Sequence, residues 1–316
     1  MKLNVNRITR AAMSATLLAS AALLASCGGG SQAQRFGASR VIAFGDESSV
    51  INADGSKYTV NALVAGSTTQ LDCGSNPLWI QSVAASYGQV FPQCPGTTAA
   101  PVSRIYAANG AKVADISAQI DQQLSNGGFA AGDLVTVLAG ANDVVAQFQQ
   151  YPAVGEDQLT ANLTAAGAAL AAQVNRLAGY DAKVLIATIP DMGLTPFAGD
   201  RSAGSTDTNP GLLSRLSTKF NDALLANLLN DGHKIGLIQL DQYLKGADTA
   251  TQFGQGGFNN TTQVACTVAL PNCTTNTLAA GAATAVWLWA DGLHLGAVGQ
   301  NSLGSLAVTR AQNNPF

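Results

Sequence analysis

Five short, β-rich stretches of this chain are apolar on both faces, and longer stretches with helical spacing separate them. The five are residues 40–44, 103–107, 134–139, 183–189 and 235–240. Strands of this kind are typical of a sheet that helices cover on each side. The alternation predicts an open parallel α/β sheet, whose functional groups gather at the carboxyl ends of the strands.

The segments between the later strands have the periodicity of helices. Apolar residues recur at near-helical spacing between the third and fourth strands, and at a strict interval of four between the fourth and fifth. They are Leu159, Leu163, Leu170, Val174 and Leu177, and then Leu212, Leu216, Phe220, Leu224 and Leu228. Residues 297–312 predict a closing helix, and the Gly- and Asn-rich residues 254–262 predict a surface excursion.

The N-terminus has the layout of an export signal. A basic start precedes the apolar residues 11–25, which are too short to span a bilayer as a permanent helix. The run ends in Leu-Ala-Ser-Cys, which resembles a bacterial lipobox with Cys27 as the lipid-modified residue. We expect a signal peptide over 1–26, Cys27 and a flexible tether over 27–38, and one domain over 39–316. An ordinary cleaved signal peptide is the alternative.

The charge of the mature chain argues against one class of partner, and its cysteine count agrees with export. Signal removal takes three of the 16 basic residues and none of the 19 acidic ones, which leaves about −6 by formal count. An acidic domain without basic runs argues against nucleic acid as a partner. Four cysteines remain in an exported chain, and Cys73–Cys94 with Cys266–Cys273 is the most local of three connectivities. We expect an anchored lipoprotein on the outer membrane or the periplasmic or cell-surface side, and a monomer.

Four polar segments fall at or beyond the strand ends. They are Gly45-Asp46-Glu47-Ser48, Asn109-Gly110-Ala111, Gly140-Ala141-Asn142-Asp143 and Asp291-Gly292-Leu293-His294. Each alone is commonly a turn or a helix cap. Together they supply a hydroxyl, backbone donors, an amide, an imidazole and a carboxylate, which are the parts for acyl transfer through serine.

In these four segments the sequence resembles the GDSL, or SGNH, hydrolases, which are serine esterases and lipases with a three-layer α/β/α, flavodoxin-like fold and a mostly parallel five-stranded sheet. The resemblance extends to residues 189–196 and 220–224 and to the loop with the second cysteine pair. It implies a serine nucleophile in the first segment and oxyanion donors from Gly110 and Asn142. It also implies Asp291 and His294 as acid and base.

The chemistry of these side chains agrees with the roles that the resemblance implies. His294 would accept the hydroxyl proton, and Asp291 would orient the imidazole. His233 lies in a polar turn before the fifth strand, at the wrong edge of the sheet for catalysis. A metal or organic cofactor is not expected, because the chain has two histidines and no Cys-x-x-Cys pair.

The first segment departs from the family pattern, in which serine directly follows Gly-Asp. Glu47 stands in the nucleophile's place when the segment is aligned without a gap, whereas a one-residue insertion in the turn would restore Ser48 to the role. Ser49 is a third choice. A carboxylate beside the oxyanion site would oppose the charge that forms there.

Three hypotheses about function follow. The first is an anchored serine hydrolase of carboxylic esters with Ser48 as the nucleophile, acting on small-molecule, lipid or glycan esters. The second is a catalytically inactive binding lipoprotein on the hydrolase scaffold, suggested by Glu47. The third is a structural envelope lipoprotein.

Overall fold

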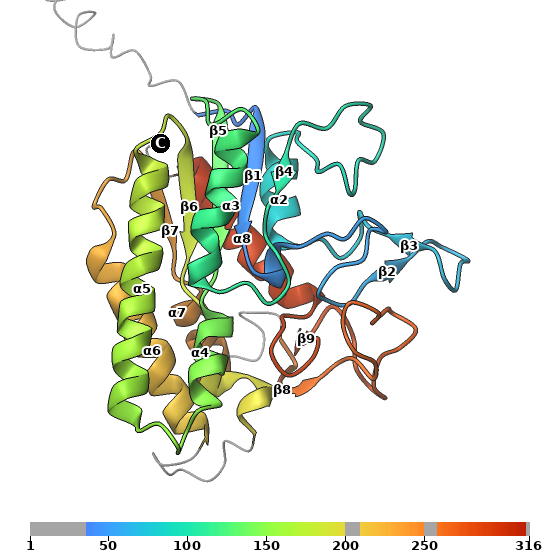
Figure 1. Cartoon of the computed structure of the whole chain (residues 1–316). Helices are drawn as coiled ribbons and strands as arrows, with labels where there is room; N and C mark the ends of the chain where they lie inside the picture. Colours follow the sequence, from blue (N-terminus) through green and yellow to red (C-terminus); the bar gives the residue numbers. More distant parts are fainter. Residues whose placement is uncertain (1–35, 200–208, 250–257, 314–316) are drawn as a thin grey trace, which may run out of the picture. The chain divides into compact units, whose positions relative to one another are not determined.

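A five-stranded, fully parallel sheet forms the centre of the protein, in the strand order β4-β1-β5-β6-β7 (Figure 1). The computed structural model describes residues 36–199, 209–249 and 258–313. The strands are β1 Arg40–Gly45, β4 Arg104–Ile105, β5 Asp133–Leu138, β6 Lys183–Ala187 and β7 Ile235–Ile238. All five coincide with the predicted stretches, and the α/β fold class is confirmed.

Helices cover both faces of this sheet. On one face α3, α4, α5 and α6 pack side by side, and on the other α2 packs against α8 (Figure 1). The α-helices are α2 Trp79–Ser86, α3 Val113–Ser125, α4 Ala141–Phe148, α5 Glu156–Ala178, α6 Asn209–Asn227, α7 Leu240–Thr249 and α8 Ala297–Asn313. The periodic segments of the sequence correspond to α5, α6 and α8, so these predictions are confirmed.

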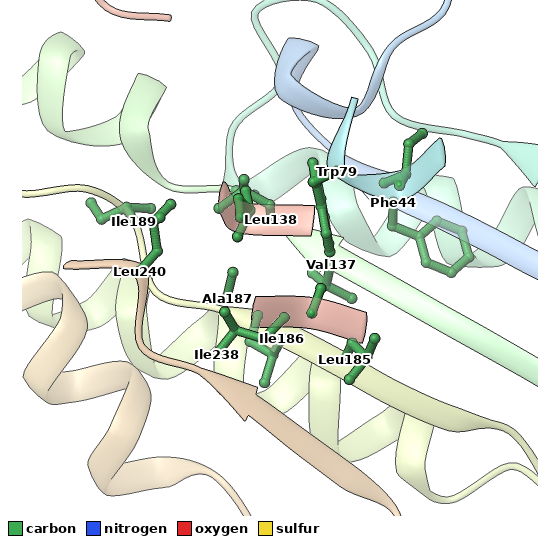
Figure 2. Close-up of a cluster of buried hydrophobic side chains, with 14 of the residues drawn as sticks. Phe44, Trp79, Val137, Leu138, Leu185, Ile186, Ala187, Ile189, Ile238 and Leu240 are labelled. Atoms are coloured by element: carbon green, nitrogen blue, oxygen red, sulfur yellow. The ribbon is translucent and has the colours of Figure 1, made fainter. Parts of the chain in front are cut away.

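The core forms where the strands meet the two helical layers. All six residues of β5 are buried, because neighbours pair on both of its edges and helices cover both of its faces. Figure 2 shows apolar side chains from β5, β6 and β7 together with Phe44 of β1 and Trp79 of α2. This packing fixes the strands from which the polar loops emerge.

Two small sheets and three 3-10 turns complete the described part of the chain. β2 Ala62–Leu63 pairs with β3 Leu71–Asp72, and β8 Asn260–Val264 pairs with β9 Trp287–Trp289. The turns are η1 Glu47–Ser49, η2 Met192–Leu194 and η3 Pro196–Ala198. None of these short elements was expected from the sequence, since two- and three-residue strands have no periodicity to detect.

Both predicted disulfides are present, Cys73–Cys94 and Cys266–Cys273. The predicted signal peptide over 1–26, the lipidation site Cys27 and most of the tether over 27–38 lie outside the described residues. Among the described residues, no helix combines the length and the apolarity that crossing a bilayer requires. The surface excursion over 254–262 is described only from residue 258 onward.

Candidate active site

The first polar segment follows β1 through a turn that only glycine permits. Gly45 has a φ of +133°, and a Cβ there would lie 1.9 Å from the carbonyl oxygen of Leu138 on β5. Asp46 then caps η1, because its Oδ1 accepts the N–H of Ser48 at 3.0 Å. The chain thus turns sharply at the carboxyl edge, and Glu47 is the first residue that faces the neighbouring loops.

The Glu47 carboxylate is the centre of the site. Its Oε2 accepts the backbone N–H of Gly110 at 2.8 Å and the amide of Asn142 at 3.0 Å. Its Oε1 is 3.0 Å from Nε2 of His294 and 3.2 Å from the Asn142 amide. The side chain is almost fully buried, with 7% of the residue exposed. Every donor that the sequence assigned to an oxyanion therefore bonds to this carboxylate.

The donors are positioned by the sheet register and by two glycines. β1 and β5 end side by side, with Gly45 opposite Leu138, so the loops that follow them are neighbours. Gly140 begins α4 with a φ of +122°, and a Cβ there would lie 2.2 Å from the ring of Phe220. Asn142 follows in the first turn of α4, where its amide also donates to the Ala111 carbonyl at 3.1 Å. This bond ties the second segment to the third.

The fourth segment forms a compact turn that orients the imidazole. Asp291 Oδ1 accepts the backbone N–H groups of Leu293 at 2.9 Å and His294 at 2.8 Å. The same carboxylate lies 2.8 Å from Nδ1 of His294. The imidazole is therefore held between two carboxylates, with Asp291 at Nδ1 and Glu47 at Nε2.

Both carboxylates favour the charged form of His294. Burial opposes the charge, but the hydrogen bonds to Asp291 and Glu47 and their negative charges outweigh it and raise the pKa of His294 to about 10. Burial likewise opposes ionisation of Glu47, but its hydrogen bond with His294 and the N–H of Gly110 lower its pKa. At neutral pH the pair is an imidazolium and a carboxylate, so the imidazole cannot accept a proton.

Asp46 is a third acid in the same turn. It is buried, and burial together with the negative charge of Glu47 raises its pKa to about 7. The hydrogen bond from the Ser48 N–H opposes this rise. The site accordingly carries its stable negative charge on Glu47 and Asp291.

The structure separates the three candidates for the nucleophile position. Ser49 is buried, and its hydroxyl accepts the indole N–H of Trp79 at 3.1 Å, so it points into the core. Ser48 is half-buried, and no hydrogen bond within the described ranges joins its hydroxyl to His294. A 3-10 helix has about three residues per turn, so neighbouring side chains point roughly 120° apart. The structure therefore brings Glu47, and not Ser48, to the imidazole.

The remaining predicted residues lie where the sequence analysis put them. Gly110, Asn142, Asp291 and His294 meet at one point, whereas His233 is exposed in the turn before β7, at the opposite edge of the sheet. Within residues 36–199, 209–249 and 258–313, no group of three His, Cys, Asp or Glu side chains is arranged to hold a metal ion.

Two aromatic residues that the sequence did not predict at the site lie beside it. The ring of Tyr58 lies 6.0 Å from that of His294, and the Phe197 N–H donates to the Gly292 carbonyl at 2.9 Å. The Phe197 ring contacts Phe148 of α4 edge-on at 6.0 Å. Tyr58 lies in an irregular segment and Phe197 in the three-residue turn η3, and neither has a motif or a period from which its place could be predicted.

An open parallel α/β fold with an Asp–His pair facing two oxyanion-type donors defines a hydrolase-type site. The chain belongs to the GDSL-like lipase/acylhydrolase family, whose model matches residues 41–306. No curated protein matches the sequence.

Solved structures with a similar fold are distant in sequence. A member of the lipolytic G-D-S-L family from Veillonella parvula is 15% identical, with a TM-score of 0.46 over 85% of this chain and 96% of its own. An extracellular lipase from Streptomyces rimosus is 17% identical, with a TM-score of 0.44 over 87% and 100%. The acetylxylan esterase Axe2 from Geobacillus stearothermophilus is 13% identical, with a TM-score of 0.44 over 88% and 96%. The family assignment rests on the family model.

Proposed function

We propose that this family member is an exported, lipid-anchored protein whose hydrolase site is built around the carboxylate of Glu47. As it stands, it does not cleave carboxylic esters through a serine. The observation that carries the proposal is the set of bonds at Glu47. The Gly110 N–H and the Asn142 amide point at Oε2, and Nε2 of His294 points at Oε1.

Two physical consequences of those bonds oppose ester cleavage by a serine. The donors that would stabilise the oxyanion of a tetrahedral intermediate already hold a negative oxygen, and a second anion there would be repelled. His294 is an imidazolium at neutral pH and has no lone pair free to take a hydroxyl proton. While Glu47 keeps its place, the donors cannot stabilise the oxyanion of an ester substrate, and His294 cannot act as a general base.

Ser48 supports a second candidate, the serine hydrolase of small-molecule, lipid or glycan esters. Its hydroxyl is half-buried in the same turn, where the Ser48 side chain bonds to Asp46 and so acts to lower the pKa of that carboxyl. Rotation of η1 by one position would bring Ser48 to His294 and move Glu47 out. Asp291 and His294 would then be the acid and base, and Gly110 and Asn142 the oxyanion donors. The bonds that hold Glu47 count against this rearrangement.

The substitution Glu47→Ser tests the proposal in the direction of a gain. It removes the carboxylate and places a hydroxyl beside the Asp291–His294 pair. The full chain in detergent should turn over a short-chain nitrophenyl ester at least a hundredfold faster than the wild type, since a positioned general base contributes roughly 10²–10⁴ in rate. A fluorophosphonate probe should label the variant at position 47 and leave the wild type unlabelled. Glu156→Ser, at the only other glutamate of the chain, is the matched control.

Wild-type labelling at Ser48 in stoichiometric yield, lost in Ser48→Ala, would contradict the proposal and establish the second candidate. The anchoring has a separate test, because it rests on the first 38 residues. Mass spectrometry of the N-terminal peptide from envelope fractions should show a lipid on Cys27 that Cys27→Ala removes.

A further inference from the structure

We propose that Glu47 is itself a nucleophile, which opens the strained ring of a small apolar epoxide to form a glutamyl ester that His294 and Asp291 then hydrolyse to a diol. This inference rests on the proposed function, since it requires Glu47 and not a serine to hold the centre of the site. The same arrangement that opposes ester cleavage by a serine would then cleave the C–O bond of an epoxide.

The two oxygens of Glu47 are in different environments, which is what a carboxylate nucleophile needs. Oε2 lies against the Gly110 N–H and the Asn142 amide, as the carbonyl oxygen of an acylated enzyme would. Oε1 faces Nε2 of His294 at 3.0 Å and accepts only a longer contact of 3.2 Å from the Asn142 amide. Attack by Oε1 on a saturated carbon leaves Oε2 as the carbonyl oxygen, already inside the donor pair.

The first step uses the Nε2 proton of the His294 imidazolium, whose nitrogen lies 3.0 Å from Oε1. A lone pair of Oε1 forms a bond to a ring carbon, and the ring C–O bond breaks. The released alkoxide oxygen takes the Nε2 proton of the His294 imidazolium. Negative and positive charge disappear together, so a neutral ester and a neutral imidazole remain, and Asp291 still holds Nδ1.

The second step uses the neutral imidazole that the first has produced. Esterification removes the negative partner of Nε2, so His294 now accepts a proton from water as the water oxygen attacks Cδ of Glu47. The negative charge develops on Oε2, where the Gly110 N–H and the Asn142 amide stabilise it. Collapse breaks the C–O bond to the substrate, and the leaving alkoxide takes the proton back from His294. The carboxyl proton then passes to the imidazole, and the sum is epoxide plus water to diol.

The surroundings of the pair indicate an uncharged substrate with an apolar substituent. The net charge of Glu47 and His294 together is zero before the first step and zero after it. Tyr58 lies beside His294, and Phe197, which is 36% exposed, is tied to the Asp291–His294 turn through Gly292. Aromatic side chains of this kind suit an apolar group attached to the ring.

The experiment follows oxygen from water into the protein. Full-length chain is incubated with styrene oxide in H₂¹⁸O, the diol is quantified, and the peptide containing Glu47 is analysed by mass spectrometry. Diol formation should be at least a hundredfold above the rate without protein, and ¹⁸O should appear in the Glu47 side chain, because water attacks Cδ. Glu47→Gln should lose turnover, with Glu156→Gln as the control. His294→Gln should also lose turnover, because His294 supplies the proton of the first step and accepts one in the second, with His233→Gln as the control.

Several results would overturn the inference. Diol without ¹⁸O in Glu47 would mean that water attacks the epoxide directly. Absence of both diol and adduct, with no serine labelled by a fluorophosphonate, would refute the reaction but leave the proposed function intact. Labelling of Ser48 would refute both. Circular dichroism of each variant separates loss of chemistry from loss of fold.

Discussion

Replacing Glu47 with glutamine should release the proton that the site holds on His294. The imidazole lies between two carboxylates, with Nδ1 2.8 Å from Asp291 and Nε2 3.0 Å from Glu47. Opposite charges at ~4 Å interact by ~4 kcal/mol at an effective dielectric constant near 20. This corresponds to ~3 pKa units at 1.36 kcal/mol each. Glu47→Gln should therefore lower the pKa of His294 from about 10 toward ~7.

The assay is a pH titration of the imidazole nitrogens by ¹H–¹⁵N correlation spectroscopy. The protein has two histidines, and the exposed His233 serves as the reference in the same spectra. A wild-type His294 that titrates near 6.5 would refute the reasoning. So would a Glu47→Gln variant that keeps its proton above pH 9, since Asp291 alone would then account for the charge.

The same pKa has a consequence for stability. His294 has a folded-state pKa of about 10, above its value of 6.5 in the unfolded chain. Its contribution is fully present below pH 6.5 and is lost as the pH rises toward 10. The shift corresponds to an upper limit on the order of 4 to 5 kcal/mol. Urea unfolding of the wild type should show this decline between pH 6.5 and 10. In the Glu47→Gln variant, most of this decline in stability should be complete by pH ~7.

Three further predictions concern the frame of the site. Gly45→Ala should lower the free energy of unfolding by more than ~2 kcal/mol, because its Cβ would overlap a β5 carbonyl at a left-handed φ; thermal unfolding measures this. Replacing Cys73 and Cys94 together by alanine should cost about 3 kcal/mol for a loop of this length, measured by urea unfolding without reductant. Asn142→Leu should raise the pKa of Glu47, because two amide contacts to its oxygens are lost; carboxyl ¹³C titration would show no change if these contacts carry no energy.

The sequence predicts the scaffold well, because the scaffold depends on local patterns. Continuous apolar runs fix which residues become β1, β5, β6 and β7, since only buried parallel strands tolerate apolar side chains on both faces. Asn142 follows β5, and the carboxyl ends of parallel strands share one edge of a sheet; His294 instead follows β9 of the separate two-stranded sheet. Pairing of nearby cysteines in an exported chain follows from the same local reasoning.

The identity of the group at the centre depends on tertiary structure. The sequence offers Glu47, Ser48 and Ser49 in consecutive positions, and a rotation of one residue within the turn would exchange them. The choice is made by contacts from distant segments: Trp79 holds Ser49 in the core, and the loops after β4 and β5 hold the carboxylate of Glu47. The side chains of neighbouring residues in η1 point about a third of a turn apart. Packing and hydrogen bonds across the fold decide which of them faces His294, and no local sequence pattern records those contacts.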